Sequence, residues 1–579
     1  MNDEIADLLE EFADRLEATG VEYKPRAYRR AAENVRAYHE SVADLARDGG
    51  ADALDDIEGV GEAIAAKIVE YVETGAIAEL EDLRAEMPAD VEALTAVEGV
   101  GPKTVGALYE ALGIETLDDL EAAAEAGEIR EVSGFGEKTE RSILEGIEFA
   151  RQAHERRLLG EARPHGERIR DYLAERESVA AVELAGSLRR WRATIGDVDV
   201  LAASDDPAAV VDALVGWDDA DDVIEAGDTK ASVRTGPVRI DLRVVVPGEF
   251  GSALQYFTGS KDHNVRLRNR AIERDLKMNE YGVFDVSGLD EAADDGQRAG
   301  ERIAGETEAS MYAALDLPWI PPELREDRGE IAAAAAGELP DLVTVDELRG
   351  DLHAHTEWSD GDLSIRDLVA GAAAFGHEYL CVSDHATGPG MVGGVGVSDD
   401  DLREEMAEIR AADEESDVDV FAGVEANVDG DGTVSVAEDV LADLDFVIAS
   451  PHAALDGDGT DRLVTAAKHP HVDAIGHPTG RLLNRRRALE LDVERLAGVA
   501  AEHGTALEVN ANPHRLDLSG SAVKTALEAG ATVVVNTDAH RTSDFAFLRY
   551  GVHTARRGWA ETGDVLNARD AAGVREFVG

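Results

Sequence analysis

The run Gly186–Leu201, GSLRRWRATIGDVDVL, combines residue types that can carry out phosphoryl transfer. Its Asp197 and Asp199 stand two residues apart in a predicted strand, so both carboxylates point to one face. Like charges on one face repel each other unless a cation lies between them, and oxygen ligands favour Mg²⁺ or Mn²⁺ over Zn²⁺. Together with Asp241 in the strand-like run VRIDLRVVV, the pattern predicts a two-metal site. The alternative is that GDVD is a surface turn between strands.

A second constellation is built from histidines, twelve of the sixteen lying in residues 348–579. His353 and His355 have the i, i+2 spacing of a chelate, and Asp360 follows in the same loop. Five further strand-like runs carry a nitrogen or oxygen ligand at or near their ends. The nine candidates are His353, His355, Asp360, His385, Glu425, His452, His477, Asp538 and His540. Such mixed ligands suit Mn²⁺, Zn²⁺ or Fe²⁺, although a lone histidine is more often an ordinary surface or hydrogen-bonded residue.

Strands that alternate with helices must position these groups. In residues 348–579 every candidate ligand lies toward the carboxyl end of a strand-like run, and this arrangement predicts a β/α barrel with its site at the top. Residues from about 155 to 250 also alternate strand and helix patterns. A cluster of prolines after Leu317 and the run EIAAAAAGELP indicate a connector between the two parts.

The first constellation resembles the family X DNA polymerases, the class of DNA polymerase beta. The similarity continues in YFTGSKDHN at Tyr256–Asn264 and in KMNEYGVF at Lys277–Phe284. The resemblance implies that two Mg²⁺ or Mn²⁺ ions are held by Asp197, Asp199 and Asp241. It further implies a triphosphate site (Gly186, Ser187, Arg190), a sugar pocket (Tyr256, Phe257, Gly259), a contact to the incoming base (Asn264) and one to the template (Arg268).

Two residues depart from the polymerase beta pattern. Trp191 replaces a glycine, and Ile195 replaces a serine that helps to bind phosphate in polymerase beta. We therefore expect the reaction class to be retained, while the affinity for nucleotide is left open.

Three glycine turns in residues 1–150 share one pattern, hydrophobic-Gly-hydrophobic-Gly followed by a helix start. The turns contain Gly59 and Gly61, Gly99 and Gly101, and Gly134 and Gly136. Glycine lets the backbone approach closely, and a helix N-terminus offers free amides to a phosphate. The turns resemble helix-hairpin-helix elements, which bind the DNA backbone without reading sequence. Glycine turns that merely cap ordinary helix pairs are the alternative.

Lys67 lies in the first hairpin, where polymerase beta carries the lysine that forms a Schiff base with an abasic 5′-deoxyribose phosphate. Such a lysine needs a lowered pKa, to which Lys24, Arg26, Arg29 and Arg30 would contribute as cations. A solvated helix lysine explains the residue equally well, so a lyase activity is left open.

The C-terminal half resembles the PHP (polymerase and histidinol phosphatase) domain, and all nine ligand positions of its trinuclear site are filled. The resemblance implies up to three Mn²⁺ or Zn²⁺ ions and phosphoester hydrolysis. The fold expected is therefore multidomain α/β: a helix-hairpin-helix α domain, a polymerase beta-like α+β palm and a PHP distorted β/α barrel. The predicted boundaries are 1–80 (lyase-like), 81–155 (DNA-binding), 156–250 (palm), 251–318 (nucleotide-binding), 319–347 (linker) and 348–579 (PHP).

The chain carries 121 acidic and 56 basic residues, which gives a formal net charge of −65. Phosphate binding relies on Lys and Arg, so this balance would ordinarily argue against nucleic acid. Because the charge is spread along the whole chain, we prefer an acidic surface adapted to molar salt, as in a halophile. The single cysteine, Cys381, excludes an internal disulfide and fits a reducing cytoplasm. No segment has the pattern of a membrane helix or a signal peptide.

These features predict a cytoplasmic, monomeric DNA repair polymerase that adds dNTPs at gapped or nicked DNA, as in base excision repair. The PHP domain is expected to act as a 3′→5′ exonuclease, with AP-site or dRP lyase cleavage as further activities. The alternatives are a small-molecule phosphatase of the histidinol-phosphate type, a binding scaffold with degenerate sites, and a template-independent nucleotidyltransferase.

Overall fold

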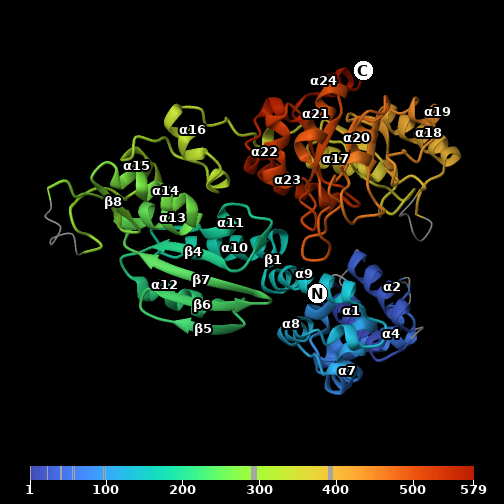
Figure 1. The fold of residues 1–579 in the computed structure, drawn as a ribbon, viewed down its shortest axis with the longest axis horizontal. Coiled ribbons are helices and arrows are strands. Elements are labelled where there is room, and N and C mark those ends of the chain that lie inside the picture. Colours follow the sequence, from blue (N-terminus) through green and yellow to red (C-terminus); the bar gives the residue numbers. More distant parts are fainter. Residues whose placement is uncertain are drawn as a thin grey trace. The chain divides into compact units, whose positions relative to one another are not determined.

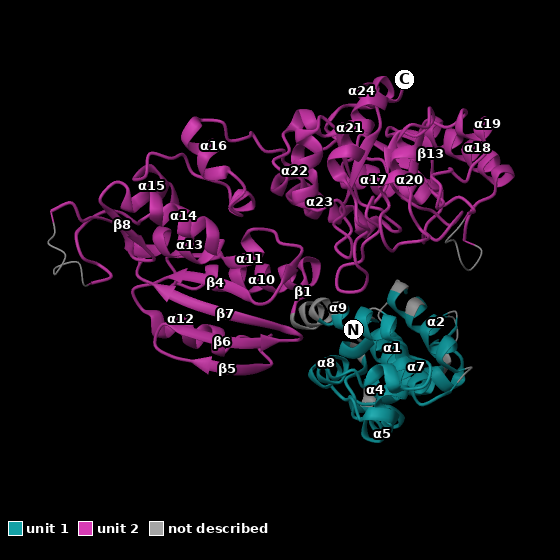
Figure 2. Ribbon diagram, in the orientation of Figure 1, with its two compact units in different colours: residues 1–155 teal, residues 156–579 magenta. Residues whose placement is uncertain are grey.

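The computed structural model describes residues 2–579 except 22–23, 39–41, 55–56, 58, 96, 98, 289–295 and 389–394. Contacts divide the chain into two compact units, residues 1–155 and 156–579 (Figure 2). The finer domain boundaries stay predictions. Within the described ranges, no helix combines the length and the apolar character needed to cross a membrane.

The described residues of the first unit form helices joined by turns, with no strand among them. Its α-helices are α1 (Asn2–Ala18), α2 (Lys24–Ala37), α3 (Val42–Gly49), α4 (Glu62–Thr74), α5 (Ala78–Glu86), α6 (Val91–Thr95), α7 (Pro102–Leu112), α8 (Leu117–Ala126) and α9 (Glu137–Glu155). Buried apolar side chains form two clusters, one within residues 5–80 and one within residues 87–147. Helices α4, α7 and α9 each begin directly after the second glycine of a repeated turn.

The second unit begins with a five-stranded sheet in the order β2-β4-β7-β6-β5 (Figure 1). The strands are β2 (Ala181–Leu184), β4 (Val198–Ala203), β5 (Asp222–Ala226), β6 (Lys230–Thr235) and β7 (Val238–Val245), with helices α10 (Leu159–Ala174) and α12 (Pro207–Val215) packed against them. In β7, buried and more exposed residues alternate, because successive side chains of a strand point to opposite faces. This alternation places Asp241 on the face opposite Ile240 and Leu242.

A three-stranded antiparallel sheet follows, in the order β10-β9-β8. It comprises β8 (Leu276–Asn279), β9 (Gly282–Asp285) and β10 (Glu301–Ala304), and it accompanies α13 (Phe250–Thr258), α14 (Lys261–Ile272) and α15 (Glu308–Ala313). The segment 319–347 contains the short helices η4 (Pro322–Leu324) and α16 (Glu330–Ala336). Arg325 and Glu330 in this segment are completely buried, so the predicted linker region is packed.

Seven parallel strands, β11 to β17 in sequence order, form the C-terminal sheet. They are β11 (Gly350–Asp351), β12 (Tyr379–Val382), β13 (Asp419–Asn427), β14 (Phe446–Ser450), β15 (Ala474–Ile475), β16 (Ala506–Asn510) and β17 (Val533–Asn536). A parallel bridge between Ala354 and Ala539 brings the segments after the first and last strands together. The sheet is therefore a nearly closed barrel, which confirms the predicted distorted β/α barrel.

Helices surround this barrel (Figure 1), as expected for parallel strands that are buried on both faces. The main ones are α17 (Ile365–Phe375), α18 (Asp399–Glu415), α20 (Thr460–Ala467), α21 (Val493–His503), α22 (Gly520–Glu528), α23 (Leu548–Arg557) and α24 (Ala571–Val578). Cys381 lies in β12 and is fully buried.

Candidate active sites

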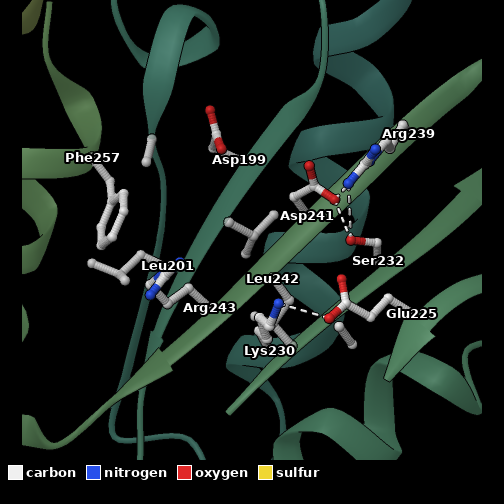
Figure 3. Close-up of a pocket in the computed structure, with 13 residues that line it drawn as sticks. Asp199, Leu201, Glu225, Lys230, Ser232, Arg239, Asp241, Leu242, Arg243 and Phe257 are labelled. Atoms are coloured by element: carbon white, nitrogen blue, oxygen red, sulfur yellow. Dashed lines mark hydrogen bonds and ion pairs between the residues drawn. The ribbon is translucent and has the colours of Figure 1, made fainter. Parts of the chain in front are cut away.

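Asp199 in β4 and Asp241 in β7 are register partners on two parallel neighbouring strands. Both line a cavity of about 230 Å³, and Figure 3 shows their side chains next to each other above the two strands. Asp197 stands one residue before β4. The structure thus places the three predicted carboxylates at one end of the β4–β7 pair, the geometry that two-metal phosphoryl transfer requires.

The electrostatics of this site favour a bound cation. Burial and the nearby charges of Asp197 and Asp241 raise the pKa of Asp199 to about 7. Burial and Asp241 also raise the pKa of Asp197. Ser232 donates a hydrogen bond to Oδ1 of Asp241, and Nε of Arg239 lies 2.9 Å from the same oxygen (Figure 3). These two donors fix the orientation of the Asp241 carboxylate.

Gly186 brings the phosphate turn directly against this carboxylate site. Its φ is +58°, in the left-handed region that favours glycine, and a Cβ added there would lie 1.9 Å from Oδ2 of Asp199. Any side chain at this position would displace the carboxylate. The glycine predicted for the triphosphate site is therefore also required by the metal site.

The two arginines of the turn are both held by carboxylates. Arg189 forms a bidentate pair with Glu308, with both distances 2.7 Å. Arg190 is buried, with Nε 3.0 Å from Oε1 of Glu326, and it also donates to the carbonyl of Thr258. Ser187, predicted to bind phosphate, lies half-buried in the short helix α11 (Gly186–Arg189).

The predicted sugar pocket lies where α13 ends and α14 begins. Tyr256 and Phe257 pack edge to face with ring centroids 5.2 Å apart, and Gly259 has a φ of +69°. The Asn264 amide donates to the carbonyl of Tyr256 at 2.8 Å, so the residue predicted to contact the base here supports the pocket wall. Arg268, predicted to touch the template, is exposed on α14.

Arg156 is a site residue that the sequence reasoning missed. Its Nε donates to Oγ1 of Thr194 at 2.9 Å, and burial together with the charge of Arg192 lowers the pKa of its guanidinium. Asp197 opposes this shift and therefore lies within electrostatic reach. Positive charge thus accumulates beside the carboxylates, where a phosphate would bind. The adjacent basic pair Arg156–Arg157 was the signal that could have identified it.

The three glycine turns of the first unit have one geometry. The first glycine of each turn is left-handed, with φ of +80° at Gly59, +80° at Gly99 and +96° at Gly134. Gly61 and Gly101, the second glycines of the first two turns, lie extended directly before their helices, and no side chain caps either helix. A Cβ at Gly61, Gly101 or Gly136 would meet nothing within 4 Å. These positions therefore leave room for a phosphate beside helix amides.

Lys67 lies in α4, and its Nζ is 2.5 Å from Oε2 of Glu79. The same ammonium group lies 4.8 Å from the ring centroid of Phe12. The amino group is thus held in an ion pair, which it would have to leave in order to attack a carbonyl group. Arg29, expected to support that chemistry, instead pairs with Asp14 and Glu17.

The nine predicted ligands of the C-terminal half come together at the carboxyl ends of the barrel strands. Each has a side-chain nitrogen or oxygen within 4.0 Å of another member of the set. Glu425 is central: its carboxylate lies 2.6 Å from His385, 2.9 Å from His477 and 3.3 Å from His452. Three groups within the set have ligand atoms close enough to share an ion: His355, Asp360, His385 and His540; His353, His355 and Glu425; His385, Glu425 and His452.

The donor atoms of this cluster fit metal ions. Although several of these groups lie close together, eight buried atoms of the set have no partner in hydrogen-bond geometry among the described residues: Nε2 of His353, both ring nitrogens of His355, Nδ1 of His385, Nε2 of His452, Nδ1 of His477, and both oxygens of Glu425. Buried polar atoms are rarely left unpaired, and each one carries a desolvation penalty. Cations that bind these atoms would remove that penalty.

Glu508 in β16 was missed by the sequence reasoning, although it holds two of the ligands. Its Oε1 lies 2.7 Å from Nδ1 of His353, and its Oε2 accepts a hydrogen bond from the backbone of His477. Burial opposes a charge on His353, but Glu508, Glu425 and Asp538 raise its pKa well above the ordinary value. With Nδ1 bound, Nε2 points toward Glu425. The signal was an acidic residue, Glu508, in the middle of the otherwise largely apolar strand ALEVN.

Several protein families match parts of this chain. The helix-hairpin-helix domain matches residues 1–77, and the SAM-like helix-hairpin-helix tandem matches 51–112 and 91–148. The DNA polymerase beta thumb matches residues 253–326, and the PHP domain matches residues 351–512. These matches cover Tyr256–Arg268 and seven of the nine C-terminal candidate ligands. The carboxylates Asp197, Asp199 and Asp241 lie outside the matched ranges, as do Asp538 and His540.

One individual relative matches almost the whole chain, and two others match about a third of it. The DNA polymerase/3′-5′ exonuclease PolX of Bacillus subtilis (strain 168) is 35% identical over 583 residues, which cover 99% of each chain. A probable phosphatase of Caldanaerobacter subterraneus subsp. tengcongensis is 31% identical over 205 residues, which are 33% of this chain and 75% of that protein. A probable phosphatase of Thermoanaerobacter sp. (strain X514) is 28% identical over 243 residues, or 39% of this chain and 93% of that protein.

Proposed function

This chain belongs to the family X DNA polymerases that carry a C-terminal PHP domain, and we propose that it fills short gaps in DNA and processes 3′ ends. The polymerase half would add dNTPs to a primer, and the PHP half would shorten 3′ ends in the 3′→5′ direction. One observation carries the proposal: a single chain combines the Asp199–Asp241 pair over a cavity with a cluster of His and carboxylate ligands.

In the polymerase half, we assign Asp197, Asp199 and Asp241 to two Mg²⁺ or Mn²⁺ ions. Such ions would neutralise the triphosphate and the charge that develops on the primer hydroxyl. Asp241, oriented by Ser232 and Arg239, faces the cavity where a 3′-hydroxyl would lie. The remaining assignments are Gly186, Ser187 and Arg190 to the triphosphate, Tyr256, Phe257 and Gly259 to the sugar, Asn264 to the base and Arg268 to the template.

In the PHP half, we assign the nine clustered ligands to as many as three Mn²⁺ or Zn²⁺ ions. Ions of this kind bind phosphate oxygens and supply hydroxide near neutral pH. Glu508 orients His353 for this task through their 2.7 Å contact. The unpaired buried donor atoms support a metal centre, and the duplex-binding hairpins on the same chain support DNA ends as its substrate.

We further propose that the paired glycines at residues 59 and 61, 99 and 101, and 134 and 136 bind the backbone of gapped or nicked DNA. Two observations support this proposal: a Cβ at Gly61 or Gly101 would meet nothing within 4 Å, and no side chain caps the helix that follows either glycine. The acidic composition supports action in concentrated salt, as in a halophile, and the single buried cysteine supports a reducing, cytoplasmic location. We further propose that the protein is a monomer.

Two other activities are less well supported. A lyase reaction at Lys67, or AP-site cleavage through it, would require the amino group to leave its 2.5 Å contact with Glu79. A small-molecule phosphatase is suggested by the two relatives named probable phosphatases, but they match about a third of the chain and leave the polymerase half unexplained.

The test is Mn²⁺-dependent extension and shortening of a labelled primer on a gapped duplex in molar KCl. We expect Asp199→Ala to abolish extension alone and His355→Ala to abolish shortening alone. His503→Ala, at an exposed residue of α21, serves as the matched control. If His355→Ala still shortens the primer, the PHP assignment is wrong. Equal extension of single strands and gapped duplex would instead identify a template-independent enzyme.

A further inference from the structure

Helix α23 of the PHP half lies against the phosphate turn of the polymerase half. The imidazole of His553 stacks on the indole of Trp191, with centroids 3.5 Å apart and planes 7° apart. The guanidinium carbon of Arg163 lies 3.3 Å from the Trp191 ring centroid. Trp191 directly follows Arg190, the arginine assigned to the triphosphate. The turn is therefore packed on a surface that is provided more than 350 residues later in the chain.

The tryptophan adopts a backbone conformation that suits glycine. Its φ is +53°, which is uncommon for a bulky residue, and polymerase beta has a glycine at this position. Compared with a glycine at this position, the Trp191 side chain gains the contacts with His553 and Arg163. The departure from the polymerase beta pattern is thus explained by packing against the PHP half.

A charged network continues from this stack to Arg190. Glu326 is 8% exposed and is surrounded by three guanidinium groups: Arg190 at 3.0 Å, Arg192 at 3.2 Å and Arg557 of α23 at 3.1 Å. Arg557 also donates to the backbone carbonyl of Arg190. One carboxylate neutralises one of three positive charges, so the cluster keeps a positive surplus next to the proposed nucleotide site.

We propose that Glu326 and Arg557 are positioning residues through which helix α23 of the PHP half holds Arg190 in place for the nucleotide triphosphate. Glu326 fixes the Arg190 guanidinium, while Arg557 fixes Glu326 and the Arg190 backbone. A pre-positioned arginine lowers the entropy lost when the triphosphate binds. The inference rests on the proposed role of Arg190 and adds that the PHP half builds part of the polymerase's substrate site.

The network separates this role from simple domain docking. The palm and α23 share a second ion pair, Glu167 with Arg549 at 3.1 Å, and Glu167 also accepts from Arg163. Among the residues that the structure describes, neither Glu167 nor Arg549 forms a hydrogen bond or ion pair with Arg190, so Arg549→Gln removes an ion pair of the same type without touching the nucleotide arginine. It is the matched control for Arg557→Lys and Glu326→Gln.

The experiment is single-nucleotide insertion on a gapped duplex with varied dNTP, which gives KM and kcat for the full-length protein. We expect Glu326→Gln to raise KM for dNTP by about tenfold with kcat changed less than about threefold. Arg557→Lys should raise KM by a smaller factor, since lysine keeps the charge but lacks the fork. Glu326→Asp should recover part of the loss, and Arg549→Gln should keep the wild-type KM.

Exonuclease activity and Tm of the same proteins show whether each variant is folded. If Glu326→Gln does not fold, the KM of Arg557→Lys tests the proposed link between α23 and Arg190. A wild-type KM in both variants overturns the inference, as does an equal rise in Arg549→Gln. Arg190→Lys separates the two levels of the argument. If this variant keeps the wild-type KM, the triphosphate assignment of Arg190 itself is wrong; if only this variant raises KM, the link to α23 is wrong.

Discussion

Asp199 and Asp241 occupy the same rung of the parallel pair β4–β7, so two carboxylates face one cavity from neighbouring strands. Without a cation this arrangement is unfavourable, because burial and the nearby acidic charges raise the pKa of Asp199 to about 7. The repulsion between these carboxylates therefore destabilises the metal-free protein, and bound divalent ions would relieve it. This destabilisation can be measured as a change in Tm, independently of catalysis.

Replacing Asp199 by Asn should stabilise the metal-free protein at alkaline pH. The ordinary pKa of the Asp199 carboxyl is 3.8 and its folded-state pKa is about 7. Between these pH values the unfolded chain releases the proton more readily than the folded protein, so the folded protein loses stability as pH rises from about 4 to about 7. In a chelator, Asp199→Asn should exceed the wild-type Tm at pH 8 by on the order of 5 °C and match it near pH 4. Asp228→Asn, at an exposed position, is the control. A wild-type Tm at pH 8 would contradict the electrostatic account.

Gly186→Ala should abolish extension while exonuclease activity is kept. The added Cβ would lie 1.9 Å from Oδ2 of Asp199, so the carboxylate must move out of its ligand position. We expect kcat for extension to fall by at least about 100-fold, because misplaced ligands lose transition-state stabilisation. Gly236→Ala is the matched control: its φ of +53° brings similar backbone strain, but its Cβ meets nothing within 4 Å. Comparable losses in both variants would assign the effect to strain.

Glu508→Gln should weaken metal binding in the PHP half without removing any proposed ligand. The substitution keeps the shape but loses the charge that faces Nδ1 of His353. Partners of this kind typically contribute about 10–100-fold in metal affinity or activity. Mn²⁺ titration by calorimetry and 3′-end shortening would show the loss, with extension unchanged. Glu494→Gln, at an exposed position of α21, should have no effect, and an unchanged Mn²⁺ affinity in Glu508→Gln would contradict the assigned role.

Gly101→Val should reduce the affinity for DNA while leaving the stability of the folded protein almost unchanged. Gly101 has an ordinary φ of −86°, and its Cβ position is open, so the folded protein accommodates a side chain. The same side chain would occupy the space that a phosphate needs beside α7. We expect about a tenfold loss in affinity for gapped duplex at fixed salt, measured by fluorescence anisotropy. Gly563→Val is the control at another open glycine; equal affinities in the two variants would exclude the turn from binding.

The sequence was most informative where chemistry imposes spacing along one strand or at one strand end. Asp197 and Asp199, two apart, and Asp241 in an alternating strand could be predicted to converge because strand geometry dictates it. The C-terminal ligands could be predicted because parallel strands of a barrel present their carboxyl ends together. The barrel and the polymerase family were both confirmed.

Residues whose role depends on a distant partner could not be predicted. Nothing around Lys67 indicates that Glu79 neutralises it, since the contact depends on how α4 and the start of α5 pack. Glu508 lies in a strand without a metal ligand of its own, and its importance emerges only when His353 is beside it. Trp191 looked like a local departure from the polymerase beta pattern, because its partner, His553, lies far along the chain.

The palm's apolar cluster includes Leu516 and Tyr550 of the C-terminal half, which are 1% and 4% exposed. During synthesis, the ribosome releases the palm strands hundreds of residues before it supplies these two side chains. Part of the palm's apolar core therefore stays exposed until translation is almost complete, and the nascent chain must be protected from aggregation during that interval. A gene truncated after the polymerase half would encode a protein whose palm core lacks the side chains of Leu516 and Tyr550.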